Sequence, residues 1–304
     1  LRQFLQCHNG TDMSQFQEQS DGVWIRKSFR LKDEPDLIIF FIPNILLFGA
    51  EPYIYIEYLT TLHGLLMMQG FDNPAIFLTS VERNSDGWNY DYYLKKLTHI
   101  WNKITNLYPN AKFVLAGSSI SATLIVSMIE QFASEGGQIE KPYGAVLNSP
   151  IPTWLLNNTE NISVSRNSKG DFVSISFLKK LSAICSSEKK VSKEFRDIIW
   201  EDAFPDGGIV ISYGDCETLL PEIKRLASKL GKFGRLKSLE RKGGIHCWPM
   251  ISFLTEDAQD EKEDSCFVMA GIIARMVVWQ MPAYLSPNLA RSSMNVLTID
   301  DVHI

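Results

Sequence analysis

Short apolar runs recur along the chain and are separated by longer stretches in which apolar residues follow a helical spacing. The apolar runs hold few polar positions, which is typical of strands buried on both faces of a parallel sheet. These runs are LIIFFI (37–42), AIFLTS (75–80), KFVLAG (112–117), GAVLNS (144–149) and GIVISYG (208–214). The helical spacing covers about 52–69, 90–107, 120–134 and 219–231. The sequence therefore predicts an α/β fold, a mostly parallel sheet with helices on both faces.

Other regions depart from this alternation. Residues of about 151–205 are rich in Asn, Ser and Lys, and we expect them to form a cap or lid insertion over the strand ends. VWIRKSFRL (23–31) alternates loosely, as an edge strand would, and the residues before it are polar and irregular. The acidic run EDAQDEKED (256–264) predicts a solvated loop, and residues of about 282–304 predict an irregular C-terminal tail. We interpret the chain as one domain of 304 residues with one insertion.

The composition excludes some functions. The chain is 45% hydrophobic and 21% charged with a net charge of -5, and it has no block of Lys and Arg, so no nucleic-acid partner is expected. The longest apolar run, 37–50, is interrupted by Pro43 and Asn44 and is shorter than the roughly 20 residues of a membrane span. Because the sequence starts at Leu1, a signal or membrane anchor could precede it, which keeps membrane association open. The oligomeric state is not predicted.

The cysteines and asparagines add little chemistry. Five cysteines lack the C-x-x-C spacing of zinc and redox sites, so no metal site is predicted. The N-glycosylation acceptor pattern occurs at Asn9, Asn157 and Asn161, about as often as chance predicts in a chain rich in Asn. These matches are compatible with a glycoprotein of the secretory pathway without establishing one.

Ser119 follows a predicted strand and precedes a predicted helix in VLAGSSISATLI (114–125). A nucleophilic serine on such a tight turn needs small residues two positions before and after it. Gly117 and Ser121 meet that need in part, since the pattern is G-x-S-x-S rather than G-x-S-x-G. The alternative is a serine that only caps the following helix.

Two later segments supply partners for such a serine. GIVISYGDCETLLPEI (208–223) presents Asp215 and Glu217 beyond a strand end, where a carboxylate could orient a histidine. RKGGIHCWPM (241–250) places His246 in a glycine-rich loop. A carboxylate at a helix start and a loop histidine each have ordinary structural roles. Their order after Ser119, however, is that of a serine hydrolase triad in α/β-hydrolases.

On these segments the chain resembles α/β-hydrolases of the hormone-sensitive-lipase and arylacetamide-deacetylase type, most closely the fungal steryl acetyl hydrolase branch. The likeness runs from about residue 36 to residue 281 and is carried by AGSSISA, NSP (148–150), YGDCETLLPE and GGIHCWP. It implies that Ser119 is the nucleophile, His246 the general base and then acid, and Glu217 rather than Asp215 the orienting carboxylate. It also implies a hydrophobic ester substrate such as a steryl acetate, no cofactor, and a location in the endoplasmic reticulum or another secretory membrane, the cytoplasm being the alternative.

One segment departs from the family. Where the family carries a His-Gly-Gly-Gly run that forms half of the oxyanion hole, this chain has FFIPNILLFGAEPY (40–53), in which Pro43 has no N–H to donate. We predict the N–H of Ile120 as one oxyanion donor and Asn44 or Ile45 as the second. Loss of one donor costs about 100- to 1000-fold in rate. The alternative function is therefore a weak or inactive hydrolase-fold protein that acts as a binding module, and a peptidase or thioesterase on the same fold also stays open.

Apolar residues in or beside the insertion have two interpretations. They line a lipid-binding pocket, or they form the small core of the cap itself. They are Phe48, Trp154, Leu155, Leu156 and Phe177.

Overall fold

The protein is seen here as a computed structural model that describes residues 15–26, 34–44, 52–82, 84, 89–135, 139–157, 163–164, 170–186, 197–255, 259–277 and 296–298. Within these residues nine strands form one sheet in the order β1-β2-β4-β3-β5-β6-β7-β8-β9. The strands are β1 (Phe16–Gln19), β2 (Gly22–Arg26), β3 (Leu37–Ile42), β4 (Ala75–Thr79), β5 (Lys112–Ser118), β6 (Gly144–Asn148), β7 (Gly208–Gly214), β8 (Leu236–Arg241) and β9 (Val296–Thr298). Only β1 and β2 run antiparallel to their neighbours, which confirms the predicted mostly parallel α/β sheet.

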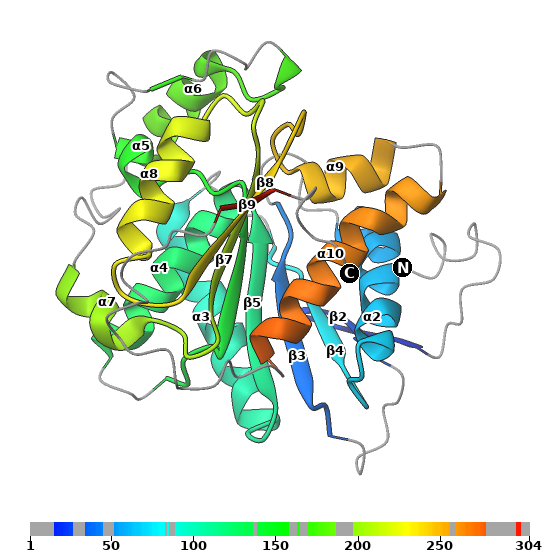
Figure 1. Ribbon diagram of the computed structural model, residues 1–304. Coiled ribbons are helices and arrows are strands. Elements are labelled where there is room, and N and C mark those ends of the chain that lie inside the picture. Colours follow the sequence, from blue (N-terminus) through cyan, green and yellow to red (C-terminus); the bar gives the residue numbers. More distant parts are fainter. Residues whose placement is uncertain are drawn as a thin grey trace.

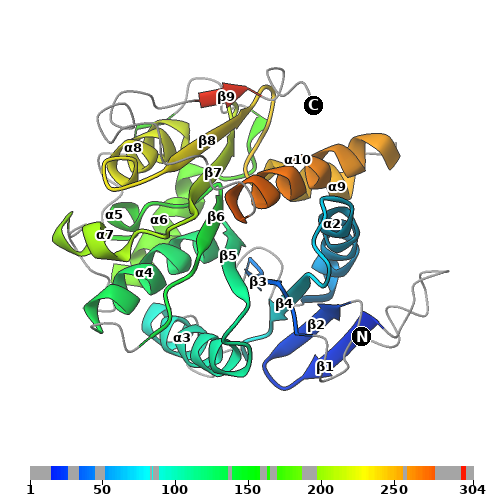
Figure 2. The ribbon, with the colours of Figure 1, turned by 60° about the horizontal axis from the view of Figure 1, so that its bottom comes forward.

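Helices cover both faces of this sheet. They are α2 (Ile56–Met68), preceded by the 3-10 turn η2 (Pro52–Tyr55), α3 (Tyr90–Leu107), α4 (Ile120–Ser134), α5 (Thr153–Asn157), α6 (Ile175–Ser186), α7 (Asp197–Ala203), α8 (Leu220–Leu230), α9 (Trp248–Thr255) and α10 (Gln259–Val277). Figure 2 shows α2 and α10 on one face, with α3, α4 and α8 on the other.

The double covering explains the continuous apolar strands. Successive side chains of a strand point to opposite faces. In β3, Ile38 and Phe40 pack into the core under α3 and α4, whereas Ile39 and Phe41 pack into the core under α2 and α10. A strand in this position has no face that tolerates polar residues, so it lacks the alternation of a half-exposed strand.

Three predictions at the margins of the fold were wrong. The strand expected over 23–31 is β2, which pairs with both β1 and β4 and is therefore not an edge. The stretch before it, expected to be irregular, contains the edge strand β1, FQEQ. Its side chains are mostly exposed, so it has no apolar pattern. The second half of the acidic run at 256–264 is the start of α10 rather than a loop, because acidic residues are favoured in the first turn of a helix.

The segment between β6 and β7, where a cap is predicted at about 151–205, contains α5, α6 and α7. Figure 1 shows α5 and α6 at the same end of the sheet as α9. Leu155 and Leu156 are buried in the core that α4 also contacts, and Trp154 and Phe177 pack against it. These apolar residues thus extend the main core, while Phe48 lies outside the described residues. A role as a cap stays a prediction.

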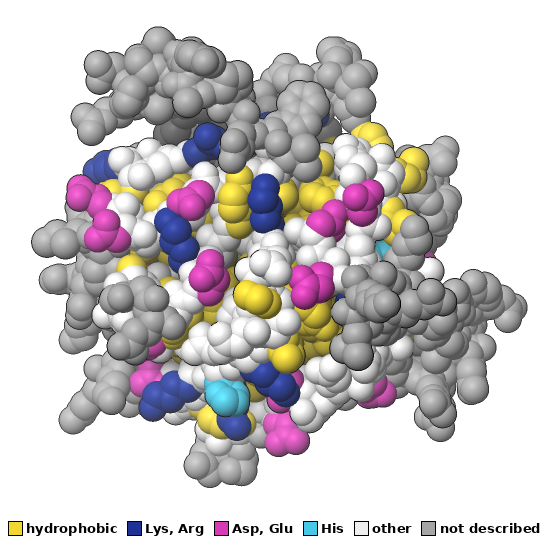
Figure 3. Space-filling model, turned by 90° about the horizontal axis from the view of Figure 1, so that it is seen from below, with side chains coloured by type: hydrophobic (Ala, Val, Ile, Leu, Met, Phe, Trp, Pro, Cys, Tyr) yellow, Lys and Arg dark blue, Asp and Glu magenta, His cyan; other side chains and the backbone are white. Residues whose placement is uncertain are grey.

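Figure 3 shows one face of the molecule. On the face seen from below in Figure 3, Lys and Arg side chains are interspersed with Asp and Glu. No helix in the described part of the chain combines the length and the apolar character needed to cross a bilayer. Of the three glycosylation acceptor residues, Asn157 ends α5, whereas Asn9 and Asn161 lie outside the described residues.

Candidate active site

Ser119 occupies the turn between β5 and α4 with a strained backbone. Its φ is 59° and its ψ is -124°, a conformation that costs a residue with a side chain about 1–3 kcal/mol. Gly117, two residues before Ser119, leaves little room for a side chain, because a Cβ there would lie 3.0 Å from Ile125 Cδ1 and 3.2 Å from the carbonyl oxygen of Ile42. The Ser119 side chain makes no hydrogen bond to the start of α4, so the alternative of a helix-capping serine lacks support.

The serine two residues after Ser119, where glycine is usual, has a structural partner. Ser121 is fully buried, and its hydroxyl donates a hydrogen bond to the carbonyl oxygen of Pro43 at 2.6 Å. This bond ties the first turn of α4 to the segment that follows β3. The serine that replaces glycine in G-x-S-x-G therefore ties α4 to Pro43, directly after β3.

We expect Ser121→Ala to lower the free energy of unfolding by about 1–3 kcal/mol, because the buried carbonyl of Pro43 would lose its donor. Urea denaturation followed by circular dichroism measures this change. Ser134→Ala is the matched control, since the Ser134 hydroxyl bonds only to the carbonyl of Glu130 at an exposed position, and it should shift stability by less than about 0.5 kcal/mol. Equal decreases in the free energy of unfolding of the two variants would contradict a stabilising role for the Ser121 hydrogen bond.

A continuous chain of hydrogen bonds joins Ser119, His246 and Glu217. The Ser119 Oγ lies 2.9 Å from His246 Nε2, and His246 Nδ1 lies 3.0 Å from Glu217 Oε2. His246 and Glu217 are fully buried, and Ser119 is 3% exposed. The structure thus brings together the three residues selected from the sequence, in the geometry of a nucleophile, a base and an orienting carboxylate.

The second oxygen of Glu217 is held from the opposite side. Glu217 Oε1 accepts hydrogen bonds from the N–H of Gly214 at 2.7 Å and from the Ser149 hydroxyl at 2.7 Å. The Ser149 oxygen in turn accepts the N–H of Cys247 at 2.8 Å. Three donors therefore face the carboxylate and fix its orientation.

Asp215, the other candidate acid, has a different task. Its Oδ1 accepts the N–H of Gly243 at 2.6 Å, in the turn after β8. That turn lies close to the end of β7, since a Cβ on Gly214 would overlap the backbone of Gly244. Asp215 thus bonds to the backbone of the loop that carries His246, whereas Glu217 bonds to the imidazole itself.

Two opposing influences act on the protonation of His246. Burial of the imidazole by itself lowers the pKa of His246, while the neighbouring Cys247 and the hydrogen-bonded Glu217 raise it, and the pKa lies well above 6.5. We attribute the increase mainly to the Glu217 carboxylate, because it bonds directly to Nδ1 of the imidazole. The imidazolium form is therefore stabilised in this pocket.

The oxyanion side of the site is only partly described. Ile120 is the first residue of α4, and the first N–H groups of a helix have no partner within it. The N–H of Asn44 donates to the hydroxyl of the buried Tyr55 at 2.7 Å. Ile45 lies outside the described residues. Ile120 thus has the position expected of a donor, while the roles of Asn44 and Ile45 stay predictions.

Residues that the sequence did not single out also contact these groups. Asp171 and Phe172, just before α6, contact His246. Ser149 lies in the NSP motif (148–150), whose sequence alone does not indicate its contact with Glu217. Asp171 and Phe172 lie in a stretch without periodicity, so only the folded chain reveals their position.

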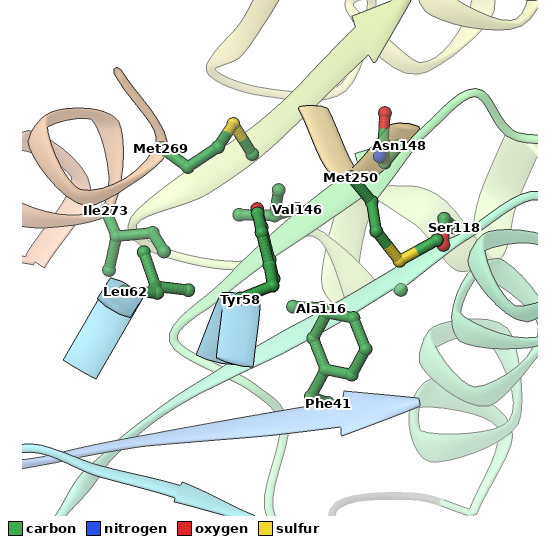
Figure 4. Close-up of a pocket in the computed structure, with 11 residues that line it drawn as sticks. Phe41, Tyr58, Leu62, Ala116, Ser118, Val146, Asn148, Met250, Met269 and Ile273 are labelled. Carbon is green, nitrogen blue, oxygen red and sulfur yellow. The ribbon is translucent and has the colours of Figure 1, made fainter. Parts of the chain in front are cut away.

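A small cavity lies on the α2 and α10 side of the sheet (Figure 4). Its volume is about 30 Å³, room for about two water molecules. Figure 4 shows Ser118 and Asn148 at one end, near the strand ends, and Leu62 and Ile273 at the other. None of the three hydrogen-bonded residues lines it, and it is too small for a steryl group.

The described residues contain no cluster of three or more His, Cys, Asp or Glu side chains able to hold a metal ion. Within the described part of the chain, Cys216 and Cys247 form no disulfide.

Comparisons with known proteins bear on the family and the fold. A family model described as steryl acetyl hydrolase matches residues 8–265. The structure of the hormone-sensitive-lipase homologue EstE7 from a metagenome library aligns with a TM-score of 0.65 at 15% identity, over 90% of this chain and 91% of that chain. Carboxyl esterase 2 of the mycorrhizal fungus Tuber melanosporum aligns with a TM-score of 0.63 at 14% identity, over 88% and 89%. These structures show the α/β-hydrolase fold alone, and no curated protein matches the chain by sequence.

Proposed function

The chain belongs to the steryl acetyl hydrolase family and is an ester hydrolase, and we propose that it cleaves hydrophobic esters such as steryl acetates through Ser119, His246 and Glu217. The observation that carries this proposal is the buried hydrogen-bond chain from Glu217 through His246 to the Ser119 hydroxyl. Such a chain makes a serine nucleophilic at neutral pH, because the imidazole can accept the hydroxyl proton.

The proposed reaction has two halves. As the Ser119 oxygen attacks the ester carbonyl carbon, its proton passes to His246 Nε2, and Glu217 stabilises the imidazolium. His246 then donates that proton to the leaving alcohol, which leaves an acyl group on Ser119. In the second half His246 takes a proton from a water molecule that attacks the acyl-enzyme, and then returns the proton to Ser119 as the carboxylic acid departs.

The oxyanion formed in both halves needs hydrogen-bond donors. We assign one to the N–H of Ile120, at the positive end of the α4 dipole. Asn44 or Ile45 is the proposed second donor, and the N–H of Asn44 can serve only by leaving the Tyr55 hydroxyl. A single donor would lower the rate by about 100- to 1000-fold relative to a complete oxyanion hole.

Support for a hydrophobic alcohol group comes from the segment between β6 and β7, which we propose as the cap. Its described part exposes Val164 by 37%, Phe172 by 44% and Ile175 by 42%. The ring of Phe172 also lies 5.6 Å from the ring of His246, edge to face. Apolar side chains thus reach from the surface to the proposed triad. Membrane association stays a prediction.

A matched ester pair tests the substrate class. We expect a steryl acetate, dispersed in detergent, to have a kcat/KM at least about 10-fold above that of ethyl acetate, because the shared acyl group leaves only the alcohol to differ. Acid release in a pH-stat measures both, with Ser119→Ala as the background. Equal kcat/KM values for the two esters would contradict the proposal that the alcohol group is a sterol. No hydrolysis of either ester would contradict the proposed catalytic role of Ser119, His246 and Glu217.

The pKa of His246 predicts how activity depends on pH. The proposed base must be neutral in the free enzyme, and a raised pKa keeps it protonated to higher pH. We therefore expect kcat/KM to fall as the pH decreases, with a midpoint above 6.5. A pH-stat series from pH 5 to 9 measures the midpoint, and a value below 6.5 would contradict the stabilised imidazolium.

A further inference from the structure

One carboxylate of the proposed cap reaches the two loops that carry Glu217 and His246. Asp171 lies just before α6, far from both loops in sequence. Its Oδ2 accepts the N–H of Thr218 at 2.7 Å, and its Oδ1 accepts the N–H of His246 at 3.2 Å. A single side chain thus bonds to the residue after the acid and to the histidine itself.

These two bonds join the loops that follow two paired strands. The acid loop follows β7, and the histidine loop follows β8. The backbone joins the loops directly through the N–H of Cys216 and the carbonyl oxygen of Gly244, at 2.9 Å. Asp171 adds a further connection from the proposed cap, and hydrogen bonds to a carboxylate acceptor are among the stronger ones in proteins.

The residue after Asp171 acts on the imidazole ring. Phe172 packs edge to face against His246, with ring centroids 5.6 Å apart and an interplanar angle of 80°. Asp171 therefore bonds to the His246 backbone while Phe172 contacts its side chain. The orientation of the imidazole depends on both sides of the site, the sheet and the cap.

We propose that Asp171 is a positioning residue, which holds the acid and histidine loops in register so that the triad is complete only while this part of the cap is in place. The inference rests on the proposed function. Misplacing a catalytic group by about 1 Å costs up to about 100-fold in rate. Asp171→Ala should therefore lower kcat by about 10- to 100-fold and leave KM within about twofold.

Hydrogen exchange separates this inference from the proposed function, because it needs no activity. In Asp171→Ala, exchange should accelerate in peptides covering 215–219 and 244–248 and stay unchanged in the peptide covering α3. Asp202→Ala removes another, exposed carboxylate from the same segment and should change neither exchange nor kcat. Phe172→Ala tests whether the ring contact alone accounts for the effect.

The outcomes decide as follows. Faster exchange in both loops together with a lower kcat, at an unchanged melting temperature, supports the positioning role. Unchanged exchange or unchanged kcat in Asp171→Ala overturns it. If exchange is unchanged in Asp171→Ala and Phe172→Ala loses as much kcat, the ring contact accounts for the effect instead. If the alanine variant fails to fold, Asp171→Asn, which keeps one acceptor oxygen, must show the same pattern in smaller measure. A wild-type protein inactive on every ester would refute the proposed function but leave the exchange result interpretable.

Discussion

Ser119→Ala is expected to lower kcat/KM for a hydrophobic acetate by about 10⁴-fold or more. The variant removes the only atom that bonds to the acyl group, while His246 and Glu217 keep their mutual hydrogen bond. The remaining rate would come from bound water activated by His246. Initial rates at saturating and subsaturating ester measure the loss, and a decrease of less than about 100-fold would contradict a covalent role for Ser119.

Ser119→Gly provides the matched control for folding. Glycine adopts the backbone conformation of residue 119, with its φ of 59°, without a steric cost. We therefore expect the free energy of unfolding of Ser119→Gly to be about 1 kcal/mol higher than that of Ser119→Ala, although both variants should be inactive. A glycine variant that is less stable than the alanine variant would argue against strain at the turn.

Glu217→Gln is expected to lower kcat by about 10³- to 10⁴-fold. The amide keeps the size of the side chain but removes the charge that stabilises the imidazolium, and it places a donor against one of the groups that now donate to the carboxylate. These groups are the N–H of Gly214, the hydroxyl of Ser149 and the Nδ1–H of His246. The same loss of charge should move the midpoint of the acid limb of kcat/KM to lower pH, because Glu217 raises the pKa of His246.

Asp215→Asn is the control for Glu217→Gln. Asp215 lies two residues earlier and accepts the Gly243 N–H through Oδ1, a bond that the asparagine oxygen can retain. Its kcat should change by less than about 10-fold. A larger decrease in kcat in Asp215→Asn than in Glu217→Gln would indicate that Asp215, and not Glu217, acts as the orienting carboxylate.

The central strands could be predicted because their environment is extreme. β3 and β7 are fully buried, so their sequences are almost free of polar residues and stand out. β8, LKSLER, was missed because its side chains are only half buried, which leaves a pattern that a loop can share. β9 lies in the tail predicted to be irregular, and a strand of three residues depends on pairing with β8 rather than on its own sequence.

The proposed triad could be assembled from the sequence by a topological argument. Ser119, Glu217 and His246 follow parallel strands, and the carboxyl ends of such strands meet at one edge of a sheet. Ser149 follows β6 at the same edge and could have been found in this way. Asp171 could not, because its partners are 47 and 75 residues away and only the packing of the cap brings them together.

Labelling with a fluorophosphonate tests most directly the claim that the buried His246 and Glu217 activate Ser119. The purified protein is treated with the probe, its intact mass is measured, and the modified peptide is identified by mass spectrometry. The account predicts one equivalent of label on the peptide that contains Ser119, slower labelling in Glu217→Gln and none in Ser119→Ala. A folded wild-type protein that takes up no label, or label that persists in Ser119→Ala, would contradict it.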